Sequence, residues 1–402
     1  MREYRVACGR ADPGADSDKE KEIKQRIYRY DNIKAILIFL VVLGHMTTDY
    51  VSDSFLIRWT TLWIYSFHMP AFIFISGLVH KHYISEEMAS LGAKGETRIR
   101  WDKVLGFFLC GYGLKLFLQF TRTLMGQHPL WHTIAEPGIP WYLFVMAEYE
   151  MLFYVMRRLD EKVKPWMMIS GAFALSAIIG YFPCVNDTFC LSRMINFLPI
   201  YMISYYLDMK EFNALLSGKK WLKAAGWCGI AISMAVCFFG KWGLYSWRKW
   251  FTGRRSYEFL TDFFPHAYSN GWWIRIAVWA VAIAITLSII AVIPDKDFGY
   301  ITTIGARTLN VYFWHRPLCY LFRNWAVLPK LFVLFGGRYD ASVAGQVKGL
   351  AFIGSNASML AAYAVYILIG AAMTAFFSLK LFEHPCSDLM KLAGKITSGK
   401  RK

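Results

Sequence analysis

The chain has 402 residues, of which 56% are hydrophobic and 17% aromatic, while only 18% carry a charge. A soluble protein of this size could not hide so much apolar surface, and a run of about 20 apolar residues is long enough to cross a bilayer. The net charge of +17 would favour a nucleic-acid partner in a soluble protein. Here the Lys and Arg residues gather in the links between apolar runs, as in cytoplasmic loops, so no nucleic acid is expected.

We expect three parts along the chain. Residues 1–28 are polar and charged and contain no early apolar core, so they are predicted to be a disordered cytoplasmic head and not a signal peptide. Residues 29–390 contain the apolar runs and are predicted to be one membrane domain, and residues 391–402 are a basic cytoplasmic tail. We expect no soluble domain in addition. The predicted fold class is therefore all-α, a polytopic membrane helix bundle.

About ten apolar runs are candidate membrane spans, and their flanks predict their orientation. Lys and Arg are frequent in the head, in the tail and in the links after the second, fourth and sixth runs. These positions alternate along a ten-span bundle, which predicts that both termini are cytoplasmic in a plasma or inner membrane. The runs are residues 33–51, 60–80, 104–124, 140–157, 166–182, 189–207, 221–240, 272–293, 308–328 and 358–382.

The first run carries a lysine at its mouth and a histidine deep inside it. Lys34 and His45 are eleven residues apart, almost three helical turns, so both project from one face about 16 Å apart along the axis. An ionisable side chain at that depth is costly, which makes it a candidate for function. The alternative is a hydrogen-bonded packing residue.

The second run contains another histidine at a similar depth. His68 lies some eight residues after the predicted outer edge of this run, close to Pro70 and Gly77, which loosen helix packing. Two histidines at matched depth on adjacent helices predict a polar cavity. An imidazole titrates near neutrality and can accept a proton from a hydroxyl group, so His45 and His68 are the candidate catalytic residues.

A basic cluster precedes the third run, on the predicted cytoplasmic side. Arg98, Arg100 and Lys103 are ordinary positive-inside charges in the simpler interpretation. Alternatively, together with Lys34, they bind the phosphates of a nucleotide-bearing donor, for which Arg is well suited.

Three further side chains are candidates for substrate binding. Trp141 opens the fourth run, Glu150 lies inside it, and His315 lies inside the ninth. An acidic residue within a span is unusual, and Glu150 could orient a histidine or neutralise a neighbouring cation. No spacing in the chain is typical of a metal site.

Two links on the predicted outer side leave alternatives open. Residues 241–271 mix basic residues, among them Arg248, Lys249, Arg254 and Arg255, with many aromatic residues. They fit an amphipathic segment on anionic lipid head groups, or a surface for an anionic or carbohydrate acceptor. The short polar link that contains Cys184 and Cys190 fits either two thiols or one disulfide bond.

Short motifs lie in a fixed order between residues 26 and 390. They are Arg29, Asp31, Lys34, Val41, Val42, Leu43, Gly44 and His45; Phe67, His68, Met69, Pro70, Ser76 and Gly77; Arg98, Arg100 and Lys103; Pro140, Trp141 and Tyr142; Tyr312, Phe313, Trp314 and His315; and Phe382, Glu383 and Pro385. This ordered set resembles the membrane acyltransferase-3 family, particularly its fucose 4-O-acetylase-like branch. Ala35 and Ser204 stand where that family usually has Gly, and the basic pair before the third run is spaced differently.

The resemblance implies an enzyme that moves an acetyl group from cytoplasmic acetyl-CoA to a hydroxyl of a glycan or its lipid-linked precursor. Acetyl-CoA, or another short acyl-CoA, would be a substrate, and we expect no permanently bound cofactor and no metal. His45 would act as general base with His68 assisting, or as carrier of an acyl-histidine. Some relatives carry a fused extracytoplasmic domain, so a separate extracytoplasmic partner is an alternative for this chain. Membrane lipids are also expected partners. A glycolipid transporter or a membrane scaffold is the competing class.

Overall fold

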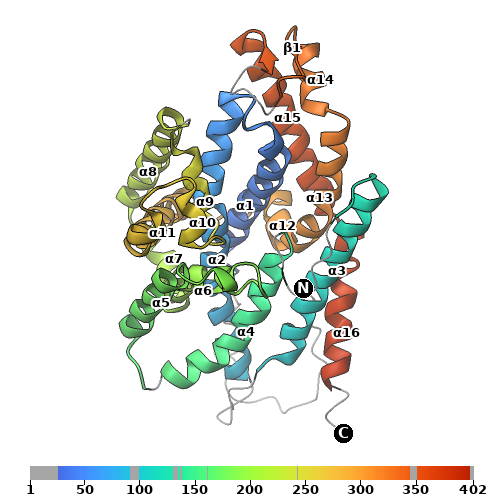
Figure 1. Cartoon of the computed structure of the whole chain (residues 1–402). Coiled ribbons are helices and arrows are strands. Elements are labelled where there is room, and N and C mark those ends of the chain that lie inside the picture. Colours follow the sequence, from blue (N-terminus) through green and yellow to red (C-terminus); the bar gives the residue numbers. More distant parts are fainter. Residues whose placement is uncertain are drawn as a thin grey trace.

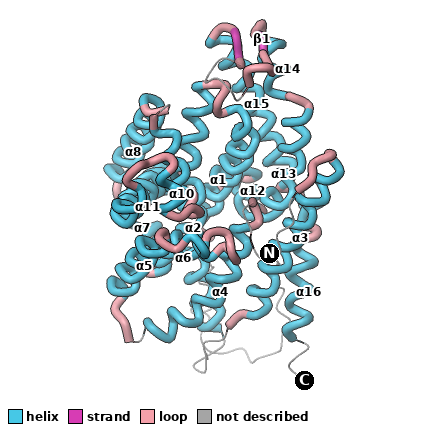
Figure 2. Tube along the Cα trace, in the orientation of Figure 1, coloured by secondary structure: helices cyan, strands magenta, loops and turns pink. Residues whose placement is uncertain are grey.

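The protein was analysed as a computed structural model, which describes residues 26–90, 99–129, 135, 138–160, 162–241, 243–344 and 351–398, with the backbone alone for residues 84–90. The structure is 78% helical with almost no sheet (Figures 1 and 2). Arg98 and most of the predicted head lie outside the described residues. The all-α fold is thus confirmed, and one small sheet is added to it.

The helices follow one another with short links. They are α1 (Tyr28–Thr47), α2 (Phe55–Ser90), α3 (Trp101–Leu124), α4 (Trp141–Asp160), α5 (Pro165–Ile179), α6 (Leu191–Tyr205), α7 (Met209–Gly218), α8 (Lys220–Phe239), α9 (Arg248–Phe251), α10 (Tyr257–Thr261), α11 (Ala267–Val292), α12 (Tyr300–Ala306), α13 (Thr308–Asn324), α14 (Val327–Leu334), α15 (Asn356–Phe377) and α16 (Cys386–Ser398). The strands β1 (Arg338–Tyr339) and β2 (Phe352–Ile353) pair antiparallel. Short 3-10 turns are Thr48–Tyr50, Pro183–Val185, Leu244–Trp247 and Lys380–Glu383.

Helix α1 lies at the centre of the bundle. It packs against α2, α12, α13 and α15, and most of its side chains are buried, because residues 35–44 are almost entirely apolar. Helices α8 and α15 lie at the outside and keep large apolar side chains such as Phe239 and Leu368 exposed, as helices that face lipid do. α16 runs alongside α3 (Figure 1).

By length and hydropathy, six described helices could cross a membrane. The predicted spans 140–157, 166–182, 189–207 and 308–328 form α4, α5, α6 and α13, which are shorter or more polar. The multi-pass character is therefore shown, while the count of ten and the cytoplasmic termini stay predictions. The six are Tyr28–Tyr50, Phe55–Tyr83, Trp101–Leu124, Lys220–Phe239, Ala267–Val292 and Asn356–Phe377.

Helices α2 and α6 approach each other closely at Gly77. A methyl group on Gly77 would collide with Ser204 Oγ and would lie only 2.7 Å from the carbonyl oxygen of Tyr201. Ser204, one of the departures from the family pattern, is thus accommodated because its neighbour has no side chain. Cys184 is exposed and Cys190 is buried, and the structure shows no disulfide bond between them.

Candidate active site

Two of the cavities in the described part of the bundle share part of their lining. The larger has a volume of about 860 Å³ and is lined by Lys34, so we call it the Lys34 cavity. The smaller has a volume of about 470 Å³ and is lined by His45 and His68, so we call it the histidine cavity. Val41, Met69 and Tyr312 line both cavities. These residues therefore form the boundary between the two cavities, on α1, α2 and α13.

Three predicted cations gather at the Lys34 cavity. Lys34 comes from α1, Arg100 directly precedes α3, and Lys103 lies in the first turn of α3. The Nζ of Lys34 is 2.8 Å from Asp31 Oδ1, and the Asp31 carboxylate also accepts a hydrogen bond from Arg26 at 2.6 Å. The rest of the lining is mainly apolar, so the cavity combines a few charged side chains with an apolar wall.

Glu150 lies in the Lys34 cavity and not beside His45. Its Oε2 is 3.3 Å from His80 Nε2 and 3.9 Å from the guanidinium of Arg100. The other ring nitrogen of His80 is 2.5 Å from the hydroxyl of Tyr201. His80 was not among the predicted site residues. The sequence gives no signal for it because its partners come from α4 and α6, which only the tertiary fold brings together.

The histidine cavity is where His45 and His68 come together. His68 Nδ1 lies 2.7 Å from the carbonyl oxygen of Ile64 in the preceding turn. A carbonyl can only accept a hydrogen bond, so we assign the proton to Nδ1, which leaves Nε2 of the neutral ring as a proton acceptor. The ring of His68 also contacts Tyr65 edge-on, with 4.9 Å between ring centres.

His315 lies behind His45 and does not line either cavity. It is fully buried, and its ring stacks on that of His45 with 5.4 Å between the centres. Its Nδ1 is 2.9 Å from the carbonyl of Val311. The neighbouring Arg316 donates to the carbonyl of His45 at 3.1 Å. Substrate binding by His315 stays a prediction, and its stacking on His45 also suits a role in positioning that ring.

Trp141 lines the histidine cavity, as a substrate-binding residue would. Its ring stacks on Phe197 with 5.5 Å between centres, and the guanidinium of Arg193 lies 4.8 Å from it. An aromatic face next to a cation suits the apolar face and the hydroxyl groups of a sugar ring.

Basic side chains from the link between α8 and α11 also line the histidine cavity. They are Arg248, Lys249, Arg254 and Arg255. Burial, together with the nearby guanidinium groups, lowers the pKa of Lys249. The described residues contain no group of three His, Cys, Asp or Glu that could hold a metal ion.

The comparisons with known proteins identify the class. A family model described as an acyltransferase domain matches residues 27–379. The chain therefore belongs to this acyltransferase family, and with its apolar helices it is a multi-pass membrane acyltransferase. The comparison with curated proteins found no match, and neither did the comparison with solved structures.

Proposed function

We propose that the protein is a membrane O-acyltransferase that moves an acetyl, or another short acyl, group from acyl-CoA to a hydroxyl of a cell-envelope glycan or its lipid-linked precursor. The single observation that carries the proposal is the pair of cavities that meet at Val41, Met69 and Tyr312. One cavity suits a phosphate-bearing donor, the other suits a hydroxyl acceptor, and the histidines lie on the acceptor side. The motifs support the fucose 4-O-acetylase-like branch and a plasma or inner membrane.

The spacing of Lys34 and His45 along α1 fits the arm of acyl-CoA. Lys34, Arg100 and Lys103 would hold the phosphates, with Arg98 a further candidate outside the described residues. The phosphopantetheine arm has a backbone of about four amino-acid equivalents, which is ~14 Å when extended. Lys34 and His45 are eleven residues apart on one helix, an axial rise of about 16 Å. A donor anchored at Lys34 would therefore bring its thioester to the shared lining residues beside His45.

The chemistry needs one base and no permanent cofactor. His45, assisted by Nε2 of His68, accepts the proton of the acceptor hydroxyl while the oxygen attacks the thioester carbonyl. The tetrahedral intermediate expels the thiolate of CoA, which receives the proton from the imidazolium. The products are the O-acyl ester and free CoA. A covalent acyl-histidine in two steps, or transfer through a separate extracytoplasmic partner, are the alternatives to direct transfer.

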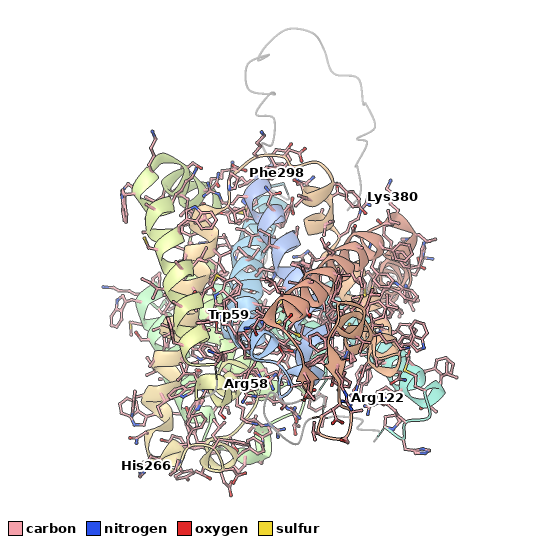
Figure 3. The ribbon with its side chains drawn as sticks, turned by 90° about the horizontal axis from the view of Figure 1, so that it is seen from above. Arg58, Trp59, Arg122, His266, Phe298 and Lys380 are labelled. Carbon is pink, nitrogen blue, oxygen red and sulfur yellow. The ribbon has the colours of Figure 1, made fainter. Side chains whose placement is uncertain are left out.

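The experiment that tests this proposal uses labelled acetyl-CoA. Membranes that contain the protein, its His45→Ala variant or a His266→Ala control are incubated with the donor, and label is followed into glycans. His266 is exposed and lies at the edge of the bundle (Figure 3), so it tests for general effects of losing a histidine. We expect His45→Ala to lose about 100-fold to 10,000-fold in transfer, and His266→Ala to be unaffected. Normal transfer by a folded His45→Ala protein would refute the proposal.

A further inference from the structure

The histidine cavity has a basic lining that acyl transfer to a neutral hydroxyl does not require. Arg248, Lys249, Arg254, Arg255 and Arg316 all line it, and none of the described lining residues is acidic. A cavity with this charge concentrates anions and repels cations. The reaction itself needs a base and a thioester, so the cations call for a separate explanation.

The basic segment is fixed as part of the fold and does not merely rest on lipid head groups. Asn196 donates to the carbonyl of Gly253 at 2.8 Å, and Arg275 donates to the carbonyl of Trp250 at 2.7 Å. Asn196 and Arg275 are both fully buried. Because buried donors on α6 and α11 fix this backbone, the cations are held toward the cavity before any ligand binds, which lowers the entropic cost of binding.

The link is anchored at its other end as well. Arg58, near the start of α2, donates to the carbonyl of Lys241 at 3.0 Å, and its guanidinium lies 4.2 Å from the ring centre of Tyr245. Figure 3 shows Arg58 toward the middle of the bundle, away from the peripheral His266. The described residues of this link, 241 and 243–256, are thus held by α2, α6 and α11.

The charges differ in how they are balanced. Arg254 makes a two-point ion pair with Asp187, with both nitrogen–oxygen distances at 2.6 Å. Lys249 instead lies over the ring of Phe263, with 3.8 Å between its Nζ and the ring centre. An aromatic face stabilises a cation without neutralising it. Lys249 therefore keeps a charge that an anionic ligand can use.

Arg248 connects the basic lining to the histidines. Its guanidinium lies 4.9 Å from the ring centre of Tyr65, and that ring lies 4.9 Å from the ring of His68. We propose that the acyl acceptor is anionic, and that a phosphate or carboxylate group of it binds to Arg248 and Lys249 while its hydroxyl reaches the histidines. This inference rests on the acyltransferase function proposed above and adds the charge of the acceptor to it.

The experiment measures thermal stabilisation of the purified protein in lipid nanodiscs by separate probes. Farnesyl diphosphate represents a lipid-linked diphosphate, a diglucuronate represents an acidic sugar, maltose is the neutral control, and CoA reports on the donor site. The Arg248→Gln/Lys249→Gln double variant is compared with the original protein and with Lys330→Gln. Lys330 is an exposed cation that lines neither cavity.

We expect at least one anionic probe to raise the melting temperature and the double variant to bind it roughly 10-fold to 100-fold more weakly for each charge removed. Lys330→Gln should behave like the original protein, and CoA should stabilise all three. Whether the diphosphate or the diglucuronate binds identifies the source of the charge.

The inference is overturned if neither anionic probe binds, if the double variant binds them normally, or if the double variant loses CoA binding instead, because the cations would then hold the donor. Absence of CoA binding by the original protein would be a different failure, that of the proposed acyltransferase donor.

Discussion

The boundary between the Lys34 cavity and the histidine cavity offers the sharpest test of the transfer route. Val41 lies on α1 between Lys34 and His45, is 3% exposed, and lines both cavities. If the acyl-CoA arm enters from the Lys34 cavity, its thioester must pass Val41 to meet the acceptor. We expect Val41→Trp to fill this space and keep the thioester from His45.

The expected size of the effect follows from the geometry. A reacting group displaced by about 1 Å can lose a factor of 100 in rate, and a tryptophan at this position displaces the thioester by more than that. We therefore expect transfer to fall by at least about 100-fold. Donor binding, measured as thermal stabilisation by CoA, should remain, because Lys34 and Arg100 are at the other end of the cavity. Overpacking should lower the free energy of unfolding by about 1–3 kcal/mol.

The matched control is Val41→Ala, which removes apolar volume without closing the passage. It should keep transfer within a few-fold of the original protein and accept longer acyl donors, measured with acetyl-, succinyl- and butyryl-CoA. Normal turnover by a folded Val41→Trp protein that still binds CoA would refute the route, since the donor would then reach the histidines by another path.

Two further changes test the donor site and the helix packing. Lys34→Met should weaken CoA binding by roughly 10-fold to 100-fold through the loss of one charge-assisted contact, while leaving the response to acceptor concentration unchanged. A titration of the melting temperature with CoA measures the affinity. An unchanged affinity would show that Lys34 is not part of the donor site. Gly77→Ala should lower the free energy of unfolding by about 1–3 kcal/mol because the added methyl group meets Ser204 and the Tyr201 carbonyl. Adding Ser204→Gly should restore part of the lost stability, measured by thermal unfolding. Unchanged stability of the Gly77→Ala variant would contradict the close contact.

The sequence was sufficient where the relevant contacts are local. The spacing of Lys34 and His45 depends only on helical geometry, and both lie on the continuous helix α1 as predicted. The matched depth of His45 and His68 depends on one link between adjacent helices, and the structure brings both to one cavity. Arg100 and Lys103 line the Lys34 cavity because they lie at the start of α3, which is also a local feature of the sequence.

The parts that the sequence missed depend on contacts between distant segments. His80 was not predicted, because its partner Glu150 comes from another helix, although both line the cavity that the proposed donor occupies. The stacking of His315 on His45 was not predicted either, because it depends on the rotation of α13. Periodicity gives the face of one helix and not the neighbour toward which that face turns.

The role of the link between residues 241 and 256 could not be predicted from its own sequence either. Its mixture of basic and aromatic residues fits lipid head groups as well as it fits an acceptor site, because both kinds of ligand bind to basic and aromatic side chains. Buried Asn196 and Arg275 bind the backbone of the link, whose basic side chains line the histidine cavity, and this placement supports the acceptor site that we propose. The two contacts span 57 and 25 residues of the sequence, so periodicity within the link does not reveal them.

The distribution of charge explains why two cavities serve an acyl transfer better than one. Cations line both cavities, whereas Val41 and Met69 at their boundary are apolar. Phosphates held by Lys34 would have to leave these partners and lose hydration to cross that boundary, which is costly for any buried charge. An acetyl thioester carries no charge and can cross it. In the proposed function, the uncharged acyl thioester can therefore reach the acceptor hydroxyl. The phosphates of the donor and the anionic group of the acceptor each stay in their own cavity, so the two substrates meet only at the atoms that react.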